Sequence, residues 1–328
     1  MRRQLRPALH CALAAAVMVV AAAGGWPGPQ GAEAAGAPVR VLYAGSLVNV
    51  FERDLGPAFT HVSGITVLGR AGGSTALAHM IRDGLVPADV FVSAEPGVNR
   101  ILAPAAGVPS ASWFLTFGTT SMVVSYAPGR RFATALRTGR WFQALASPGL
   151  RLGRTDPALD PKGFRTILVM RLAETYYHEP GLARRVLGPD ENPAQIFPEE
   201  ALIGRLTSGQ LDAGFFYLVE AVAERLPYVT LPAALNLSDP EYAASYATAS
   251  YVDASGVRHS GAPIVYTVTI PSASRNSRGA ARFVAFLLGR EGRALLAARG
   301  VLGVPVRAGG SAAAVPVSLR PFVTGPYH

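Results

Sequence analysis

Two serines stand at equivalent places in the sequence, each directly after a glycine and at the start of a predicted helix. They are Ser46, after Gly45, and Ser74, after Gly73. The first backbone N–H groups of a helix lack partners inside the helix and carry a partial positive charge, so they attract anions, and a serine hydroxyl can donate a further hydrogen bond. Serine also serves commonly as a plain helix cap. Both roles remain open, and the first predicts an anion site at the carboxyl edge of a sheet.

Two more side chains have the chemistry to join such a site. Asp160 precedes Pro161 at a third predicted helix start, and Tyr217 ends a predicted strand. Asp160 fits the role of a helix cap, and its carboxylate would repel an oxyanion unless a high-valent metal centre takes it as an additional ligand. Tyr217 could donate its hydroxyl to a cleft or act only as a half-buried packing residue.

The sequence carries no recognisable catalytic or cofactor motif. It has no histidine pair with zinc spacing, no G-x-S-x-G elbow and no glycine-rich loop with the lysine of a P-loop, and Lys162 is its one lysine. We therefore expect a binding protein without a cofactor rather than an enzyme.

The first 34 residues have the layout of a secretory signal peptide. A cationic start precedes the apolar run 12–23, and Ala32-Glu33-Ala34 offers an Ala-x-Ala cleavage site. The run is shorter than the about 20 residues of a membrane span, although an uncleaved anchor remains an alternative. Cys11, the one cysteine, lies in this segment, so the mature chain is expected to have no disulfide. We expect residues 1–34 to be a signal peptide and the mature protein to be periplasmic.

The formal net charge of +9 bears on the partners. Its arginines are scattered and export separates the protein from nucleic acid, so we expect no nucleic-acid partner. A positive field attracts an anionic ligand, but scattered surface arginines also explain the charge through solubility alone.

Short strands, glycine-containing turns and helices alternate along the chain, which is typical of α/β domains with parallel sheets. Strands are expected at 39–43, 65–68, 88–92, 121–126, 211–217 and 264–270, and helices at 46–59, 74–81, 133–145, 162–177, 200–207, 278–288 and 291–298.

This order predicts two α/β lobes, with the second inserted into the first. Residues 36–116 and 263–306 are expected to form lobe 1, and residues 119–261 lobe 2. The two chain crossings between them make a natural hinge. Residues 307–328 are expected to be a C-terminal tail, which is loose because small residues fill 309–314.

Six short motifs follow one another along the chain. They are Tyr43-Ala44-Gly45-Ser46-Leu47, Ala71-Gly72-Gly73-Ser74, Ala88-Asp89-Val90-Phe91-Val92-Ser93-Ala94, Asp160-Pro161-Lys162-Gly163-Phe164-Arg165, Asn236-Leu237-Ser238-Asp239-Pro240-Glu241-Tyr242 and Gly261-Ala262-Pro263-Ile264-Val265-Tyr266. No single motif is specific, but the ordered series resembles one family, the molybdate/tungstate-binding proteins of ABC transporters. The resemblance covers about Val39 to Pro305.

The resemblance implies a type II periplasmic-binding-protein fold, with two lobes, a hinge and an interlobe cleft that closes on the anion. It implies that Ser46 and Ser74 donate from the first lobe through hydroxyl and backbone groups. The loop ending at Asp160 and the strand end at Tyr217 would contribute from the second lobe. In the archaeal branch, an aspartate of that loop and a glutamate just before the tyrosine bring carboxylate oxygens to the metal.

The chain departs from that branch, because Phe216 occupies the glutamate position. Asp160 remains as a candidate contact to the bound metal, whereas Glu220 is expected to lie a helical turn or more away. An apolar residue before the tyrosine is similar to the bacterial molybdate-binding branch. We therefore expect a tetrahedral, hydrogen-bonded anion, with Tyr217 donating and Lys162 adding positive charge near the cleft.

The resulting hypothesis is an extracytoplasmic solute-binding protein, monomeric, that captures molybdate or tungstate and delivers it to the membrane permease of an ABC importer. Cavity size would select molybdate over sulfate. The alternatives are a binding protein for another anion, such as sulfate or phosphate, and an exported enzyme or adhesion module on the same scaffold.

Overall fold

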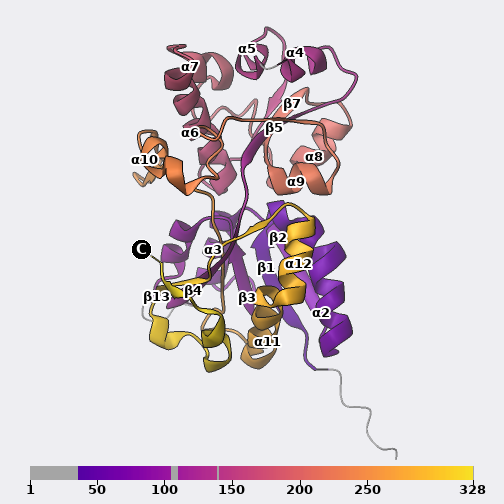
Figure 1. Ribbon diagram of the computed structural model, residues 1–328, viewed down its shortest axis with the longest axis vertical. Coiled ribbons are helices and arrows are strands. Elements are labelled where there is room, and N and C mark those ends of the chain that lie inside the picture. Colours follow the sequence, from indigo (N-terminus) through magenta and orange to yellow (C-terminus); the bar gives the residue numbers. More distant parts are fainter. Residues whose placement is uncertain (1–35, 105–109, 139, 328) are drawn as a thin grey trace, which may run out of the picture. The chain divides into compact units, whose positions relative to one another are not determined.

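The computed structural model describes residues 36–104, 110–138 and 140–327. In these residues, two separate mixed sheets are flanked by helices, and a short antiparallel hairpin joins β9 (Ser250–Val252) to β10 (Arg258–Ser260) (Figure 1).

The larger sheet holds eight strands in the order β14-β13-β4-β11-β3-β1-β2, with β12 paired to β4. Strands β1, β2 and β3 are parallel, whereas β11 runs antiparallel to β3 and β4. The strand bounds are β1 Val39–Ala44, β2 Val67–Gly72, β3 Val90–Ser93, β4 Trp113–Thr119, β11 Tyr266–Thr269, β12 Leu302–Gly303, β13 Arg307–Gly310 and β14 Gly325–Pro326.

Helices from distant parts of the sequence cover this sheet. Val41 and Leu42 of β1 point to opposite faces and are both buried, as expected of a parallel strand with helices on each side. Phe59 of α2 (Gly56–Ser63) packs edge-to-face on Phe283 of α11 (Ser277–Leu288), with ring centroids 5.2 Å apart. The remaining helices around this sheet are α3 (Ser74–Arg82), η3 (Pro96–Leu102) and α12 (Arg290–Ala298).

The smaller sheet has four strands in the order β6-β7-β5-β8. Its central pair is antiparallel, with Met122 opposite Tyr217. The strands are β5 Met122–Tyr126, β6 Leu152–Gly153, β7 Ala213–Tyr217 and β8 Tyr228–Thr230, and the helices of this region are α4 Ala133–Arg137, α5 Trp141–Leu145, α6 Pro161–Tyr176, α7 Leu182–Leu187, α8 Glu199–Thr207, α9 Leu218–Ala223 and α10 Ala243–Tyr246.

Two chain segments connect the two sheets. One runs from β4 of the larger sheet to β5 of the smaller sheet, and the other returns from β10 to β11 of the larger sheet. They are tied together where Thr119 Oγ1 donates a hydrogen bond of 2.6 Å to the carbonyl oxygen of Ile264. The two crossings therefore lie side by side, which is the arrangement that a hinge requires.

The predicted strands and helices are largely present, with shifted ends. The helical segment after β1 runs from Gly45 to Ser63 and contains the π-helical turn η2 (Phe51–Leu55) between α1 (Val48–Val50) and α2. The helix expected over 133–145 is wrong as a single element, because it forms the two helices α4 and α5.

The expectation of a loose C-terminal tail is wrong. Strand β13 pairs with β4 in antiparallel register, opposing Gly309 to Phe114, and Leu319 in η6 (Val317–Phe322) is fully buried. A Cβ atom on Gly309 would lie 2.1 Å from the ring of Phe114. The small residues of this segment therefore allow close packing against the sheet rather than mobility.

Among the described residues, no helix is long and apolar enough to cross a membrane. The predicted signal peptide, residues 1–34, lies outside the described residues.

Candidate functional site

The sheet register brings the two glycine–serine turns together. Strands β1 and β2 are parallel neighbours with Ala44 opposite Gly72, so Gly45-Ser46 and Gly73-Ser74 leave the same edge of the sheet. Both serines are almost fully buried, at 3% and 1% exposure. The turns thus lie next to each other, at the carboxyl edge where α/β sheets bind ligands.

Asp160 and Tyr217 approach from the region of the smaller sheet, and both are buried. Asp160 is the N-cap of α6: its Oδ1 accepts a 2.8 Å hydrogen bond from the Lys162 backbone N–H. Its Oδ2 is buried beside the Thr155 hydroxyl, which helps to lower the pKa of Asp160 against the rise that burial causes, and it has no other hydrogen-bond partner among the described residues. Asp160 therefore caps α6 through Oδ1 alone, and its Oδ2 takes no part in the cap.

Tyr266 of β11 links Ser46 to Tyr217. The Ser46 and Tyr266 hydroxyl oxygens are 3.2 Å apart, and the Tyr266 and Tyr217 rings meet edge-to-face with centroids 6.5 Å apart. Only one hydroxyl of the Ser46–Tyr266 pair can use its hydrogen in their shared bond, so the other hydroxyl keeps a hydrogen to donate.

Arg165 links Tyr217 to Ser74. Its Nη1 donates to the Tyr217 hydroxyl oxygen at 2.6 Å and to the Ala94 carbonyl at 2.8 Å, while the Ala94 N–H donates to Ser74 Oγ at 3.1 Å. Its Nη2 is paired with the carboxylate of Glu95. Arg165 is fully buried and was not identified as a site residue from the sequence, although it lies in the quoted motif.

These contacts leave the Ser74 and Tyr217 hydroxyl groups oriented as donors. Each oxygen accepts a hydrogen bond from an N–H group, and neither hydroxyl donates to a residue in the described part of the chain. Because a buried O–H group needs an acceptor, both hydrogens are available to an anion placed between the two sheets.

Gly45 and Gly73 lie close to residues from the region of the smaller sheet. The Gly45 N–H donates a 3.0 Å hydrogen bond to Glu199 Oε2. A Cβ atom on Gly73 would lie 2.5 Å from the Leu159 carbonyl oxygen and 3.2 Å from Asp160 Cβ. The six predicted site residues therefore lie in one region, where the segments that follow β1 and β2 meet the segment before α6, the start of α8 and the end of β7.

A buried ion-pair cluster adjoins this region. Lys162 Nζ lies 3.1 Å from Glu199 Oε1 and 2.7 Å from Glu220 Oε1, and Glu220 Oε2 accepts the Tyr217 backbone N–H at 2.8 Å. Glu220 was expected a helical turn or more away; it follows Tyr217 by three residues, and its side chain turns back to cap α9 and reaches this cluster. Lys162 is near the site, as expected, but it is paired with two carboxylates and adds no free positive charge.

Burial dominates the ionisation of this cluster. Desolvation raises the pKa of Asp160, Glu199 and Glu220, and the Lys162 ammonium opposes that rise. Burial lowers the pKa of Lys162, but the carboxylates of Glu199 and Glu220 outweigh it and hold the pKa above its ordinary value. Carboxylates outnumber cations around the site: Asp160, Glu199, Glu220 and Glu95 face Lys162 and Arg165.

Phe216, which occupies the position of the expected glutamate, adjoins this cluster. Phe216 is fully buried, and Lys162 Nζ lies 5.6 Å from the centre of its ring. In the described ranges, no three His, Cys, Asp or Glu side chains converge closely enough to hold a metal ion. The donor set of hydroxyls and amides fits a whole oxyanion better than a bare cation.

A cavity of about 320 Å³ opens beside the converging residues, lined by Gly73, Thr155, Asp160 and Glu199 among others. Of the six predicted site residues, Gly73 and Asp160 line this cavity, whereas Gly45, Ser46, Ser74 and Tyr217 do not.

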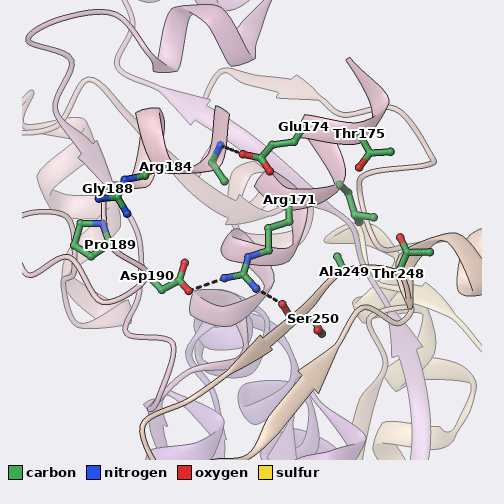
Figure 2. A pocket seen from close by; sticks show the side chains of 12 residues that line it. Arg171, Glu174, Thr175, Arg184, Gly188, Pro189, Asp190, Thr248, Ala249 and Ser250 are labelled. Atoms are coloured by element: carbon green, nitrogen blue, oxygen red, sulfur yellow. Dashed lines mark hydrogen bonds and ion pairs between the residues drawn. The ribbon is translucent and has the colours of Figure 1, made fainter. Parts of the chain in front are cut away.

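A separate pocket of about 580 Å³ lies at α6 and α7 and contains none of the predicted site residues. Figure 2 shows Arg171 at its centre, with Nη2 2.6 Å from Asp190 Oδ2 and with Nη1 donating to the Ser250 carbonyl. Arg171 is already paired with Asp190, Arg184 also lines the pocket, and none of the buried hydroxyl donors described above belongs to it.

Comparison with known proteins places the chain among binding proteins. It is 32% identical over 293 residues to an uncharacterized solute-binding protein of Petrotoga mobilis, covering 87% of this chain and 89% of that protein. It is 30% identical over 248 residues to the molybdate/tungstate-binding protein of Thermococcus kodakarensis, covering 68% of each chain.

The solved structure of the Azotobacter vinelandii periplasmic molybdate-binding protein covers 80% of this chain and 98% of its own, with 19% identity and a TM-score of 0.55. This likeness confirms the two-lobed α/β periplasmic-binding-protein fold. The profile of the bacterial extracellular solute-binding proteins matches residues 39–302. The chain therefore belongs to the family of bacterial extracellular solute-binding proteins, which function outside the cytoplasm as binding proteins and not as enzymes.

Proposed function

We propose that this protein captures molybdate or tungstate and delivers it to an ABC importer. The single observation that carries the proposal is a set of buried hydroxyl groups whose hydrogens have no acceptor among the described residues. They belong to Ser74, Tyr217 and one member of the Ser46–Tyr266 pair. Hydrogen bonds from fixed donors to an ion are about twice as strong as neutral ones. The naming of relatives as molybdate/tungstate-binding proteins supports the metal oxyanion over other anions.

The proposed lobes are 36–116 with 263–306, and 119–261. Strands β13 and β14 of the C-terminal segment add to the larger sheet, which belongs to lobe 1. Ser46 and Ser74 with the amides of Gly45 and Gly73 act from lobe 1. Tyr217 and Asp160 act from lobe 2. The anion is held as a tetrahedral unit by these donors. The buried Oδ2 of Asp160, which the helix cap does not use, supports Asp160 as the candidate for a direct contact to the metal.

The proposal includes the setting in which the protein works. An N-terminal signal peptide exports the chain to the periplasm, where it acts as a monomer without a cofactor. Closure of the lobes on the anion creates the surface that docks on the membrane permease. The hydrogen bond from Thr119 to Ile264, which ties the two chain crossings together, supports a hinge between the lobes.

Isothermal titration of the exported protein against molybdate, tungstate, sulfate and phosphate tests this function. We expect tight, saturable binding of molybdate and tungstate at one site per chain, and weak or no binding of sulfate and phosphate. Tight binding of sulfate or phosphate with none of molybdate or tungstate would assign the site to another anion. Absence of binding for all four would overturn the proposal.

A further inference from the structure

The Glu199 side chain bridges the two halves of the proposed site. Glu199 begins α8, is 6% exposed, and receives hydrogen bonds on both carboxylate oxygens. Lys162 Nζ donates to Oε1 at 3.1 Å, and the Gly45 N–H donates to Oε2 at 3.0 Å. A Cβ atom on Gly45 would lie 2.4 Å from that same Oε2. The carboxylate therefore packs directly on the glycine of the first serine turn.

This contact occupies a donor that the proposed ligand needs. Gly45 immediately precedes Ser46, and its amide is one of the groups expected to bind the anion. An amide hydrogen engaged by a carboxylate is not free for a second anion, and two anionic groups that share one donor repel each other. An incoming oxyanion must either displace Glu199 or tolerate it as a neighbour.

The two cations described at the site, Lys162 and Arg165, are already engaged and do not offset this repulsion. Lys162 is shared between Glu199 and Glu220, and Arg165 is engaged by Glu95 and the Tyr217 hydroxyl. The groups facing Glu199 are the shared ammonium from α6, the Gly45 amide, and the Asp160 and Glu220 carboxyl groups. Burial and these two carboxyl groups raise the pKa of Glu199, whereas the Lys162 ammonium, which donates directly to its Oε1, opposes that rise and favours the ionised pair.

Tetrahedral oxyanions differ in how they can meet a fixed carboxylate. The sulfur of sulfate accepts no additional oxygen ligand, and sulfate carries no proton at neutral pH. The metal of molybdate or tungstate can accept an additional oxygen donor, and the O–H group of hydrogen phosphate can donate a hydrogen bond to the carboxylate. Sulfate alone of these anions has no favourable contact to offer Glu199.

We propose that Glu199 is a specificity-determining residue that excludes sulfate from the site by holding its carboxylate on the Gly45 amide. The inference rests on the proposed function, and it assigns discrimination to a charged side chain rather than to cavity size. Replacing the carboxylate by an amide removes the repulsion while keeping the shape and a hydrogen-bond acceptor for Lys162.

The test compares dissociation constants for sulfate and molybdate in wild type and Glu199→Gln, measured by titration calorimetry at constant ionic strength. We expect the ratio of the sulfate to the molybdate constant to fall at least about tenfold in the variant, since like-charge contacts cost several kcal/mol and 1.4 kcal/mol is tenfold. Glu241→Gln makes the same charge change at an exposed position and is expected to leave the ratio as in wild type.

A second variant guards against misfolding around Lys162. Glu199→Asp keeps the negative charge beside the ammonium but is one methylene too short to reach Gly45, so it is expected to shift the ratio in the same direction by a smaller factor. An unchanged or increased ratio in either folded variant overturns the inference. If wild type and both variants bind none of the anions, the proposed function itself fails.

Discussion

The buried hydroxyls of Ser74 and Tyr217 share a feature that separates them from ordinary packing residues. Each oxygen is fixed by an N–H donor, Ala94 N for Ser74 and Arg165 Nη1 for Tyr217, so the direction of each hydrogen is set by the protein before any ligand binds. Such preorganisation reduces the ordering that binding requires. At the scale of single residues, affinity should depend on these two oxygens.

Ser74→Ala and Tyr217→Phe are each expected to weaken molybdate binding roughly 10- to 100-fold, because a hydrogen bond to a charged group contributes about 1.5–3 kcal/mol. Titration calorimetry measures the change, and circular dichroism checks the fold. Tyr176→Phe removes a hydroxyl from a side chain that is 48% exposed and serves as the matched control, with unchanged affinity. Wild-type affinity in both site variants would contradict the assignment of these donors.

The residues at the site differ in how far the sequence reveals them. Ser46, Ser74 and Tyr217 could be predicted because each follows or ends a strand whose position the local pattern fixes. Glu220 carried a local signal as well, since its spacing from Tyr217 is that of a helix cap. Glu199 carried none, because its contact with Gly45 joins residues 154 positions apart and depends on how the two lobes meet.

At the scale of elements, the C-terminal segment shows why composition can mislead. A run of small residues suggests a loose chain, yet the same residues let β13 pair with β4 while the ring of Phe114 covers Gly309. The decisive information is the facing surface of β4, which the segment itself does not contain. Leu319 then fills a buried site next to the sheet and anchors the segment.

Leu319→Ala is expected to lower the free energy of unfolding by about 2–5 kcal/mol, as is typical when a fully buried leucine is truncated. Chemical denaturation monitored by fluorescence measures the loss. Val317→Ala, two residues away at 73% exposure, should change the free energy by less than about 0.5 kcal/mol. Equal, small effects of the two substitutions would mean that the segment is not part of the folded core.

At the scale of the whole molecule, the proposed ligand site lies where the two proposed lobes meet. The Ala76 N–H of α3 donates to the Leu159 carbonyl at 3.1 Å, and Gly73 lies against the same carbonyl group. A residue without a side chain is needed there, since a Cβ atom at 2.5 Å from an oxygen is not sterically possible. The two lobes of the fold were predictable from the order of elements, but this contact was not.

Gly73→Ala should therefore hold the turn after β2 away from the segment before α6. We expect molybdate affinity to fall roughly 10- to 100-fold, because forcing an extra carbon into a packed contact costs about 1–3 kcal/mol. Gly303→Ala adds the same carbon where no atom lies within 4 Å and should bind as wild type does. Retained affinity in Gly73→Ala would show that the ligand does not require this approach of the lobes.

The most direct test of an oxyanion site between the lobes is a crystal structure of the protein with tungstate, with anomalous diffraction measured at a tungsten absorption edge. We expect one dominant anomalous peak, from a tungsten atom whose surrounding oxygens lie within hydrogen-bonding distance of the Ser46, Ser74 and Tyr217 hydroxyl groups. A dominant peak in the pocket around Arg171 (Figure 2), or no peak at saturating tungstate, would contradict it.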